Sequence, residues 1–192
     1  MIMLVEPRRS GGAAGVLLTV ACVAMGLLSG LFYAYDLSVM PGLSRLDDAA
    51  YLTAMRNFND AIDNSGPFAV LFLGALAATV CAAVAEHRRG RRAAAAWAAG
   101  AGVLYLAVLV LTVAVNLPLN GELARLGDPA KIADPSLADR FKGAWSAANL
   151  ARTVLTTAAV VCLAQALRLH GTATTTSPRT EPLSQPVPHR AS

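Results

Sequence analysis

Residues 67–85 read PFAVLFLGALAATVCAAVA, and stretches of this kind decide the fold. This stretch carries no charged side chain, and neither do residues 12–35 and 93–115. Each of the three runs for about 19 to 24 residues, which is enough for a helix to cross a hydrocarbon core of about 30 Å. A fourth apolar stretch, 144–167, is interrupted only by Arg152. Because a bilayer interior offers no water to backbone N–H and C=O groups, these stretches must be helices.

The composition is that of an integral membrane protein. Of 192 residues, 55% are apolar and only 15% are charged, and the mean hydropathy is +0.50, which does not suit a soluble surface. We therefore predict an all-α, integral membrane four-helix bundle with short interfacial helices in its outer loops. The expected spans are about 12–40, 67–86, 93–116 and 144–168. Residues 1–10 are expected to form a cytoplasmic N-terminus, 11–170 the membrane domain, and the Thr-, Ser- and Pro-rich residues 171–192 a disordered cytoplasmic tail.

Basic residues beside the apolar stretches predict the orientation. By the positive-inside rule they belong in the cytoplasm, so both termini of this multi-pass cell-membrane protein are expected inside. The longer connections, 41–66 and 116–143, are then outside. Membrane topology also accounts for the net charge of +4 without nucleic acid as a partner. The basic residues concerned are Arg8, Arg9, Arg168, Arg179, Arg190 and the segment HRRGRR at 87–92.

Cysteine and histidine give no sign of a metal site. The histidines lie in basic loops or in the tail, and each cysteine stands alone inside an apolar stretch. The chain also lacks a Gly-rich nucleotide motif. We therefore expect no haem and no His-ligated metal inside the bundle. The residues are His87, His170, His189, Cys22, Cys81 and Cys162.

Both outer connections contain helical patterns. Residues 47–64 place apolar side chains at helical spacing with acids on the other side, which predicts a short amphipathic helix on the membrane surface. Asp134 and Pro135 suit a helix N-cap and first turn, so the last helix is expected to begin before its membrane span. The apolar residues of the two patterns are Leu52, Met55, Phe58 or Asn59, and Ile62 in the first, and Leu137, Phe141 and Trp145 in the second.

Polar residues gather at the outer ends of the spans. Cα–Cβ bonds tilt toward a helix N-terminus, so Asp36 points back into the membrane and Arg152 tips outward. Their depths match, and an ion pair between them is expected because an unpaired charge there is costly. Asn116 and Asn120 flank Pro118, which is expected to end or kink its helix. The full set is Asp36, Asn57, Asn59, Asn116, Asn120, Asn149 and Arg152.

This arrangement predicts a polar cavity that opens outward. Trp145, Asn149 and Arg152 form one stripe on the last helix, and Tyr33 and Tyr35 can add phenols. Each residue also has a purely structural explanation. Asparagines can hold helices together, Arg152 and Asp36 can snorkel toward the headgroups, and Trp145 can anchor the helix at the interface. Gly26 and Gly30 form a small-xxx-small pair typical of close helix packing.

Several motifs resemble the anthrone oxygenase-like family of four-helix membrane proteins, over roughly residues 15–165. They are GLFYAY at 30–35, SVMPGL at 38–43, Met55 with Asn57 and Asn59, Pro67-Phe68, NLPLN at 116–120, and Trp145, Asn149 and Arg152. The chain departs from the family pattern at Ser65-Gly66, which separates Asn64 from Pro67. In relatives these two residues are often adjacent, so the rim of the pocket is expected to differ.

The resemblance implies that the protein oxidises an anthrone-like or other acidic aromatic substrate with molecular oxygen and without a cofactor. Arg152, Asn149 and Asn116 would then stabilise a developing oxyanion, and Asp36 would act as base or orient Arg152. Trp145, Phe32 and Tyr33 would stack on the rings, with Asn120 and Asn59 beside them. Two other functions remain open: a membrane protein that binds or transports a small hydrophobic or anionic solute, and a structural subunit.

The expected orientation has a direct test. A cysteine introduced near Asp60, in the connection 41–66, should react with an impermeant thiol reagent in intact cells, because that connection is expected outside. The unmodified chain, whose cysteines all lie in apolar stretches, is the control. Labelling only after lysis would mean that the orientation is inverted.

Overall fold

The computed structural model describes residues 12–126 and 136–175, and every regular element in these ranges is a helix. Four continuous helical stretches are long and apolar enough to cross a membrane: Gly12–Leu43, Gly66–Arg88, Arg92–Arg125 and Ser136–Thr172. The predicted all-α four-helix architecture is confirmed. The central helices of these stretches are α1 (Gly12–Ala34), α4 (Gly66–Arg88), α5 (Arg92–Leu111) and α8 (Ser146–Thr175). Arg8, Arg9, Asp134, Pro135, His189 and the tail arginines lie outside the described residues.

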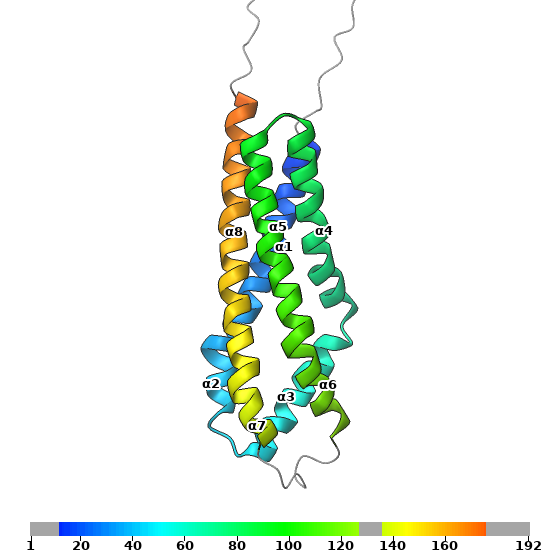
Figure 1. The fold of residues 1–192 in the computed structure, drawn as a ribbon, viewed down its shortest axis with the longest axis vertical. Helices are drawn as coiled ribbons and strands as arrows, with labels where there is room; N and C mark the ends of the chain where they lie inside the picture. The colour runs from blue at the N-terminus through cyan, green and yellow to red at the C-terminus, as the bar shows by residue number, and fades with distance from the viewer. Residues whose placement is uncertain (1–11, 127–135, 176–192) are drawn as a thin grey trace, which may run out of the picture.

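The long helices form a ring in which each contacts two neighbours: α1 packs against α4 and α8, and α5 also packs against α4 and α8. Successive helices run in opposite directions (Figure 1). The start of α1, the α4–α5 connection and the end of α8 therefore lie at one end of the bundle. The short helices gather at the other end. The polar residues that the sequence places at the outer ends of the spans, such as Asn116, Asn149 and Arg152, lie at this end as well.

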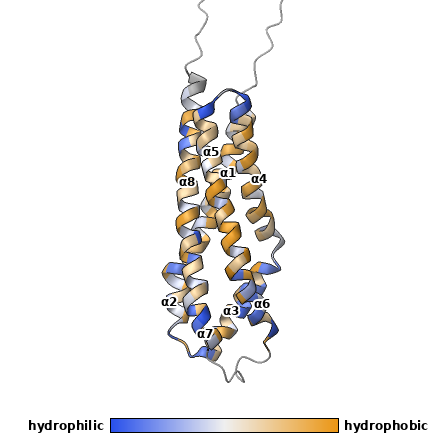
Figure 2. Cartoon of the chain, viewed as in Figure 1, coloured by the Kyte–Doolittle hydropathy of each residue, from blue (hydrophilic) through white to orange (hydrophobic). Residues whose placement is uncertain are grey.

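Small residues fill the middle of the bundle, and large apolar residues cover its outside. Alanine supplies much of the buried core, which lets helix backbones approach closely. Valine and leucine side chains such as Val16, Leu73, Val103 and Val161 are more than half exposed. Figure 2 shows hydrophobic residues along the long helices and hydrophilic residues toward the two ends. Because lipid is as apolar as these side chains, the distribution suits a bilayer.

Within residues 12–126 and 136–175, three wide π-helical turns interrupt the long helices, all at the end that carries the short helices. They are η1 (Tyr35–Val39), η2 (Thr112–Asn116) and η4 (Phe141–Trp145). Backbone N–H groups close them over five residues, as Leu117 does to the Thr112 carbonyl. Pro41 and Pro118 each follow such a turn by two residues, and a widened turn gives the proline ring the space that a regular helix denies it. Pro118 was expected to end or kink its helix; an end does not occur, since α6 (Leu117–Arg125) continues the helix.

The short helices close the end of the bundle. α2 (Met40–Leu43), α3 (Asp48–Asp63), α6 and α7 (Ser136–Arg140) bury a second apolar cluster beneath them. α3 is the predicted amphipathic helix, capped by the Asp47 carboxylate, which accepts a hydrogen bond from the Ala50 N–H at 2.9 Å. Leu52, Met55 and Asn59 are buried, whereas Phe58 is 39% exposed. α3 therefore packs on the bundle as well as presenting a polar face.

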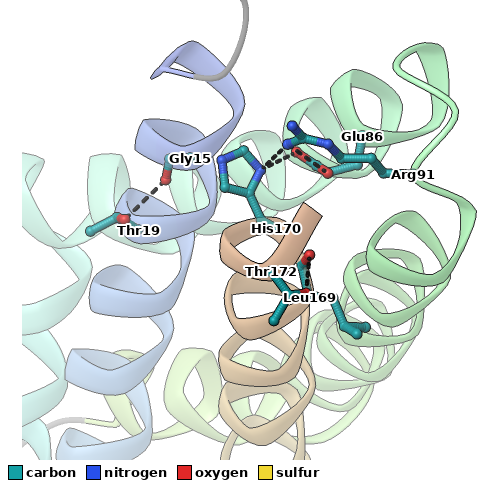
Figure 3. Close-up of polar contacts among 7 residues, drawn as sticks. All are labelled: Gly15, Thr19, Glu86, Arg91, Leu169, His170 and Thr172. Atoms are coloured by element: carbon teal, nitrogen blue, oxygen red, sulfur yellow. Dashed lines mark hydrogen bonds and ion pairs between the residues drawn. The ribbon is translucent and has the colours of Figure 1, made fainter. Parts of the chain in front are cut away.

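A buried polar cluster joins the helices at the opposite end (Figure 3). The Glu86 side chain is fully buried, and its Oε1 lies 2.7 Å from His170 Nδ1. Arg91 Nη1 lies 2.7 Å from the same nitrogen and 3.7 Å from Glu86 Oε2. Glu86 lies on α4, Arg91 directly precedes α5, and His170 lies on α8. The cluster therefore links three helices at the end of the bundle opposite the short helices.

Gly15 brings α1 close to the same cluster. A Cβ atom at Gly15 would lie 3.0 Å from His170 Nε2, closer than side chains normally approach. At Gly26 and Gly30, by contrast, a Cβ would meet nothing within 4 Å. The sequence-based explanation of Gly26 and Gly30 by close helix packing is therefore wrong. The close approach that needs a glycine is at Gly15.

We expect Gly15→Ala to lower the free energy of unfolding by roughly 1–3 kcal/mol, because the new methyl group would displace the His170 ring. Gly26→Ala is the matched control on the same helix and should be neutral or stabilising by up to about 1 kcal/mol through helix propensity. Unfolding in mixed detergent micelles measures both. Equal effects of the two substitutions would contradict the close approach at Gly15.

Candidate functional site

A cavity of about 260 Å³ lies where the π-helical turns meet the short helices. Its volume is near the lower end of the roughly 300–1,000 Å³ of common small-molecule pockets. Residues from α1, α3, α4, α6 and α8 and from all three π-helical turns line it. Its aromatic residues are Phe32, Tyr35, Phe68, Phe72 and Trp145, and its polar residues are Asn59, Asp63, Thr112, Asn116, Asn120, Asn149 and Arg152.

Arg152 is the central cation of the cavity. Its side chain comes from α8 and the residue is only 7% exposed. The guanidinium carbon lies 4.5 Å from the centre of the Phe32 ring and 5.5 Å from that of Trp145, so two aromatic faces stabilise the charge. Nη2 donates a hydrogen bond to Asn149 Oδ1 at 2.8 Å, and Nη1 makes a long contact of 3.5 Å with Thr112 Oγ1.

Asn149 connects Arg152 to Asp36. Its Nδ2 donates to Asp36 Oδ1 at 2.7 Å and to the Phe32 carbonyl at 2.9 Å, while its Oδ1 accepts from Arg152. The Asp36 carboxylate and the Phe32 carbonyl accept hydrogen bonds, whereas Arg152 donates one. The amide must therefore turn its NH2 group toward Asp36 and Phe32 and its oxygen toward Arg152. The expected direct ion pair is wrong: no Asp36–Arg152 contact within 4.0 Å occurs. The amide occupies the space between the two charges.

Asp36 itself does not line the cavity. Its Oδ2 accepts a hydrogen bond from Thr153 Oγ1 at 2.5 Å, on the far side of Asn149. The carboxylate is therefore held by α8 from behind, where it faces shallow outer grooves beside Met40 and Leu37. Of the two roles that the sequence leaves open for Asp36, this position suits orientation of Arg152 through Asn149 better than contact with a bound molecule.

Three buried polar atoms around the cavity have no hydrogen-bond partner within the described residues. They are Arg152 Nε, Asn116 Oδ1 and Asn59 Nδ2. Asn116 is 2% exposed, and its Nδ2 reaches the Trp145 carbonyl only at 3.5 Å. A buried donor or acceptor without a partner costs about 1–3 kcal/mol. A ligand that brings an acceptor toward Arg152 and Asn59 would relieve part of that cost.

The tryptophan at the cavity is fixed from two sides. Trp145 Nε1 donates to Asn120 Oδ1 at 3.0 Å, and its ring lies 5.7 Å from that of Tyr35. Asn120 thus has a structural partner as well as a place in the lining. The Asn120 side chain holds the indole edge so that the Trp145 ring stays against Arg152.

Two aromatic residues that the sequence did not single out as site residues form the opposite wall. Phe68 and Phe72, four apart on α4, stack with ring centres 5.4 Å apart. Phe68 is part of the Pro67-Phe68 motif, and its helical spacing to Phe72 was the available signal. Of the two tyrosines, Tyr35 lines the cavity, whereas Tyr33 is 55% exposed on the outer surface. The π-helical turn that starts at Tyr35 changes which side chains face inward.

The mouth of the cavity is formed by the end of α3. Asn59, Ile62 and Asp63 lie on one face of this helix because they are three and four residues apart. Asp63 is the second charged residue of the lining, and the sequence-based list of site residues did not include it. In the sequence Asp63 lies in an acidic connection, where a carboxylate is ordinarily solvated. Only the packing of α3 across the bundle end brings it to the cavity.

These features define a multi-pass helical membrane protein with an aromatic cavity around a buried cation. A family model then identifies the chain more closely: the model named "Anthrone oxygenase" matches residues 66–162, which is half of the chain. The protein belongs to the anthrone oxygenase family. The matched region contains Asn116, Trp145, Asn149 and Arg152, but not Phe32 or Asp36. No match was found among curated proteins or among solved structures.

We expect Asn149→Leu to lower the free energy of unfolding by about 1–3 kcal/mol, since it removes hydrogen bonds from both Asp36 and Arg152. Asn57→Leu, at an exposed position of α3, is the matched control and should change stability by no more than about 0.5 kcal/mol. Unfolding of both variants in mixed micelles is the measurement. A neutral Asn149→Leu would show that the amide does not hold the two charges together.

Proposed function

We propose that this protein is a cofactor-independent oxygenase that oxidises an anthrone-like aromatic substrate to a quinone with molecular oxygen. Membership of the family supports the reaction class. The observation that carries the proposal is the cavity in which Arg152, buried and clamped between Phe32 and Trp145, leaves Nε without a partner. A cation with a free donor suits a substrate oxygen that gains negative charge during the reaction.

The chemistry needs few groups. An anthrone becomes reactive toward oxygen when it loses a proton from its methylene carbon, because the resulting enolate is electron-rich and places negative charge on the carbonyl oxygen. Arg152 would stabilise that oxygen, and Asn116 would assist from η2. Asp36 would act as a positioning residue, since it fixes Asn149 and Asn149 fixes the guanidinium. A guanidinium that is already oriented costs no reorganisation when charge develops.

The aromatic residues would bind the flat ring system. Phe68 and Phe72 lie on one side of the cavity, and Phe32, Tyr35 and Trp145 contribute from α1, η1 and η4. Stacked or edge-on aromatic contacts would add about 0.5–1.5 kcal/mol each beyond their apolar burial. Tyr33 is not included in this binding surface because its ring faces outward.

A binding protein without catalysis is the alternative that the test must separate. The bundle beyond the cavity is filled by buried residues such as Leu18, Met25 and Leu28. That packing favours a closed pocket over a transport path through the described part of the bundle. Binding of the substrate at the cavity without oxygen consumption would therefore support a binding protein.

We expect purified protein in detergent to consume oxygen with dithranol or emodin anthrone, with one oxygen molecule used for each quinone formed. Arg152→Gln should lower kcat by about 10²–10³-fold, the usual effect of removing an oxyanion donor. Oxygen uptake and quinone absorbance are measured against a protein-free blank, since anthrones also oxidise slowly by themselves.

The matched control is Arg168→Gln, the same change near the end of the same helix, where the exposed Arg168 donates a hydrogen bond from Nε to Gln165 Oε1. It should keep the full rate. Circular dichroism confirms that each variant is folded. A wild-type rate equal to the blank, or an unchanged rate in folded Arg152→Gln, would overturn the proposal.

A further inference from the structure

We infer that Asp63, rather than Asp36, is the base that removes the substrate proton at the mouth of the cavity. This inference rests on the proposed function. It starts from the shape of the substrate class. In an anthrone the carbonyl and the methylene lie on opposite sides of the central ring, so the group that holds the oxygen and the group that takes the proton must face each other across the cavity.

The two charged residues of the lining come from different helices, as this requirement demands. Arg152 projects from α8, while Asp63 lies at the end of α3, one of the short helices that close the end of the bundle. Asp36 does not meet it, because it lies behind Asn149 on the same side as Arg152 and outside the lining. A base at Asp36 would need the carbonyl and the methylene on the same side of the ring.

Asp63 is free to take a proton. No hydrogen bond or ion pair of its carboxylate occurs among the described residues, whereas both oxygens of Asp36 accept hydrogen bonds. Although the Asp63 residue is exposed, partial burial of its carboxyl raises the pKa above its usual value, and the charge of Asp60 adds to the rise. A carboxylate with a raised pKa is the stronger base.

A second cavity gives the proton a way out. This cleft of about 380 Å³ lies between α3 and α6 and shares Asn59, Asp63 and Asn120 with the substrate cavity. Its other lining residues are mostly polar, including Arg56, Asn57 and Asp60. Asp63 therefore stands at the boundary between an aromatic pocket and a polar cleft, where a base can exchange its proton with water.

The step balances with oxygen as the only oxidant. The Asp63 carboxylate takes one methylene proton, and the C–H electron pair moves into the ring to give the enolate whose oxygen faces Arg152. Oxygen accepts these electrons and forms a C–O bond to the former methylene carbon, and the peroxide regains the proton from Asp63. Removal of the second proton by Asp63 then cleaves the O–O bond, and hydroxide leaves as water with that proton. The products are quinone and water, and Asp63 returns to its carboxylate form.

The test separates proton removal from oxidation. Without oxygen, wild-type protein mixed with dithranol should form the enolate, which absorbs at longer wavelength than the neutral anthrone. Asp63→Asn should slow this step by about 10²–10⁴-fold, the usual contribution of a general base, and Asp63→Glu should restore part of the rate. Asp139→Asn, an exposed carboxylate on α7 outside both cavities, is the control and should keep the wild-type rate.

The rate should also depend on pH in a predictable direction. Asp63 must be deprotonated, so the rate should rise with pH through its raised pKa. Asp60→Asn removes a negative charge that raises this pKa, so the rising limb should move to lower pH. Among the described residues that line the two cavities, the other charged groups are Asp60 and Arg56 on α3 and Arg152 on α8, since α4 and α6 contribute only uncharged residues.

The results for Asp63→Asn and Asp60→Asn distinguish the role of Asp63 from the proposed function as a whole. Slow enolate formation in folded Asp63→Asn, with a normal Asp139→Asn, would support the inference. A wild-type rate in Asp63→Asn, or an unmoved limb in Asp60→Asn while wild-type protein still oxidises the anthrone, would overturn Asp63 as base and leave the proposed function standing. Wild-type protein that neither forms the enolate nor consumes oxygen would overturn both.

Discussion

The hydrogen bonds that hold Arg152 are the constraint on which the polar end of this protein depends. A guanidinium that is 7% exposed in a helix suited to a membrane must have partners. Asn149 supplies one, and its amide links Arg152 to the Asp36 carboxylate through two hydrogen bonds without direct contact between the two charged groups. The Phe32 and Trp145 rings supply the rest. The result is a cation that is held firmly, although its buried Nε has no hydrogen-bond partner among the described residues.

The π-helical turns explain how so many side chains reach one small space. In a regular helix the side-chain direction repeats every 3.6 residues. A widened turn changes the direction in which the following side chains point. In η1 the shift accompanies an inward Tyr35 and an Asp36 that meets Asn149. In η2 and η4 the turns carry Asn116 and Trp145 to the lining. Such turns often occur at functional sites.

The two ends of the bundle contain different kinds of polar structure. At one end, Glu86, Arg91 and His170 form a compact polar cluster that joins helices, and Gly15 allows α1 to approach it. At the other end the short helices leave an aromatic pocket and a polar cleft side by side, with Asp63 between them. Stability and the proposed chemistry thus depend on residues far apart along the helices, which lets variants at the two ends be interpreted independently.

The sequence alone determined the four helices, the amphipathic α3 and the end at which polar residues meet, because apolar length and helical spacing are local properties. It also identified most of the polar residues that line the cavity, namely Asn59, Asn116, Asn120, Asn149 and Arg152. The tertiary structure decided which of these groups contact one another. The direct Asp36–Arg152 pair was expected from matched depth, but depth does not reveal that Asn149 stands between them. The inward turn of Tyr35 and the approach of Asp63 depend on π-helical phase and on the packing of α3 across the bundle, and neither follows from the spacing of residues within one helix.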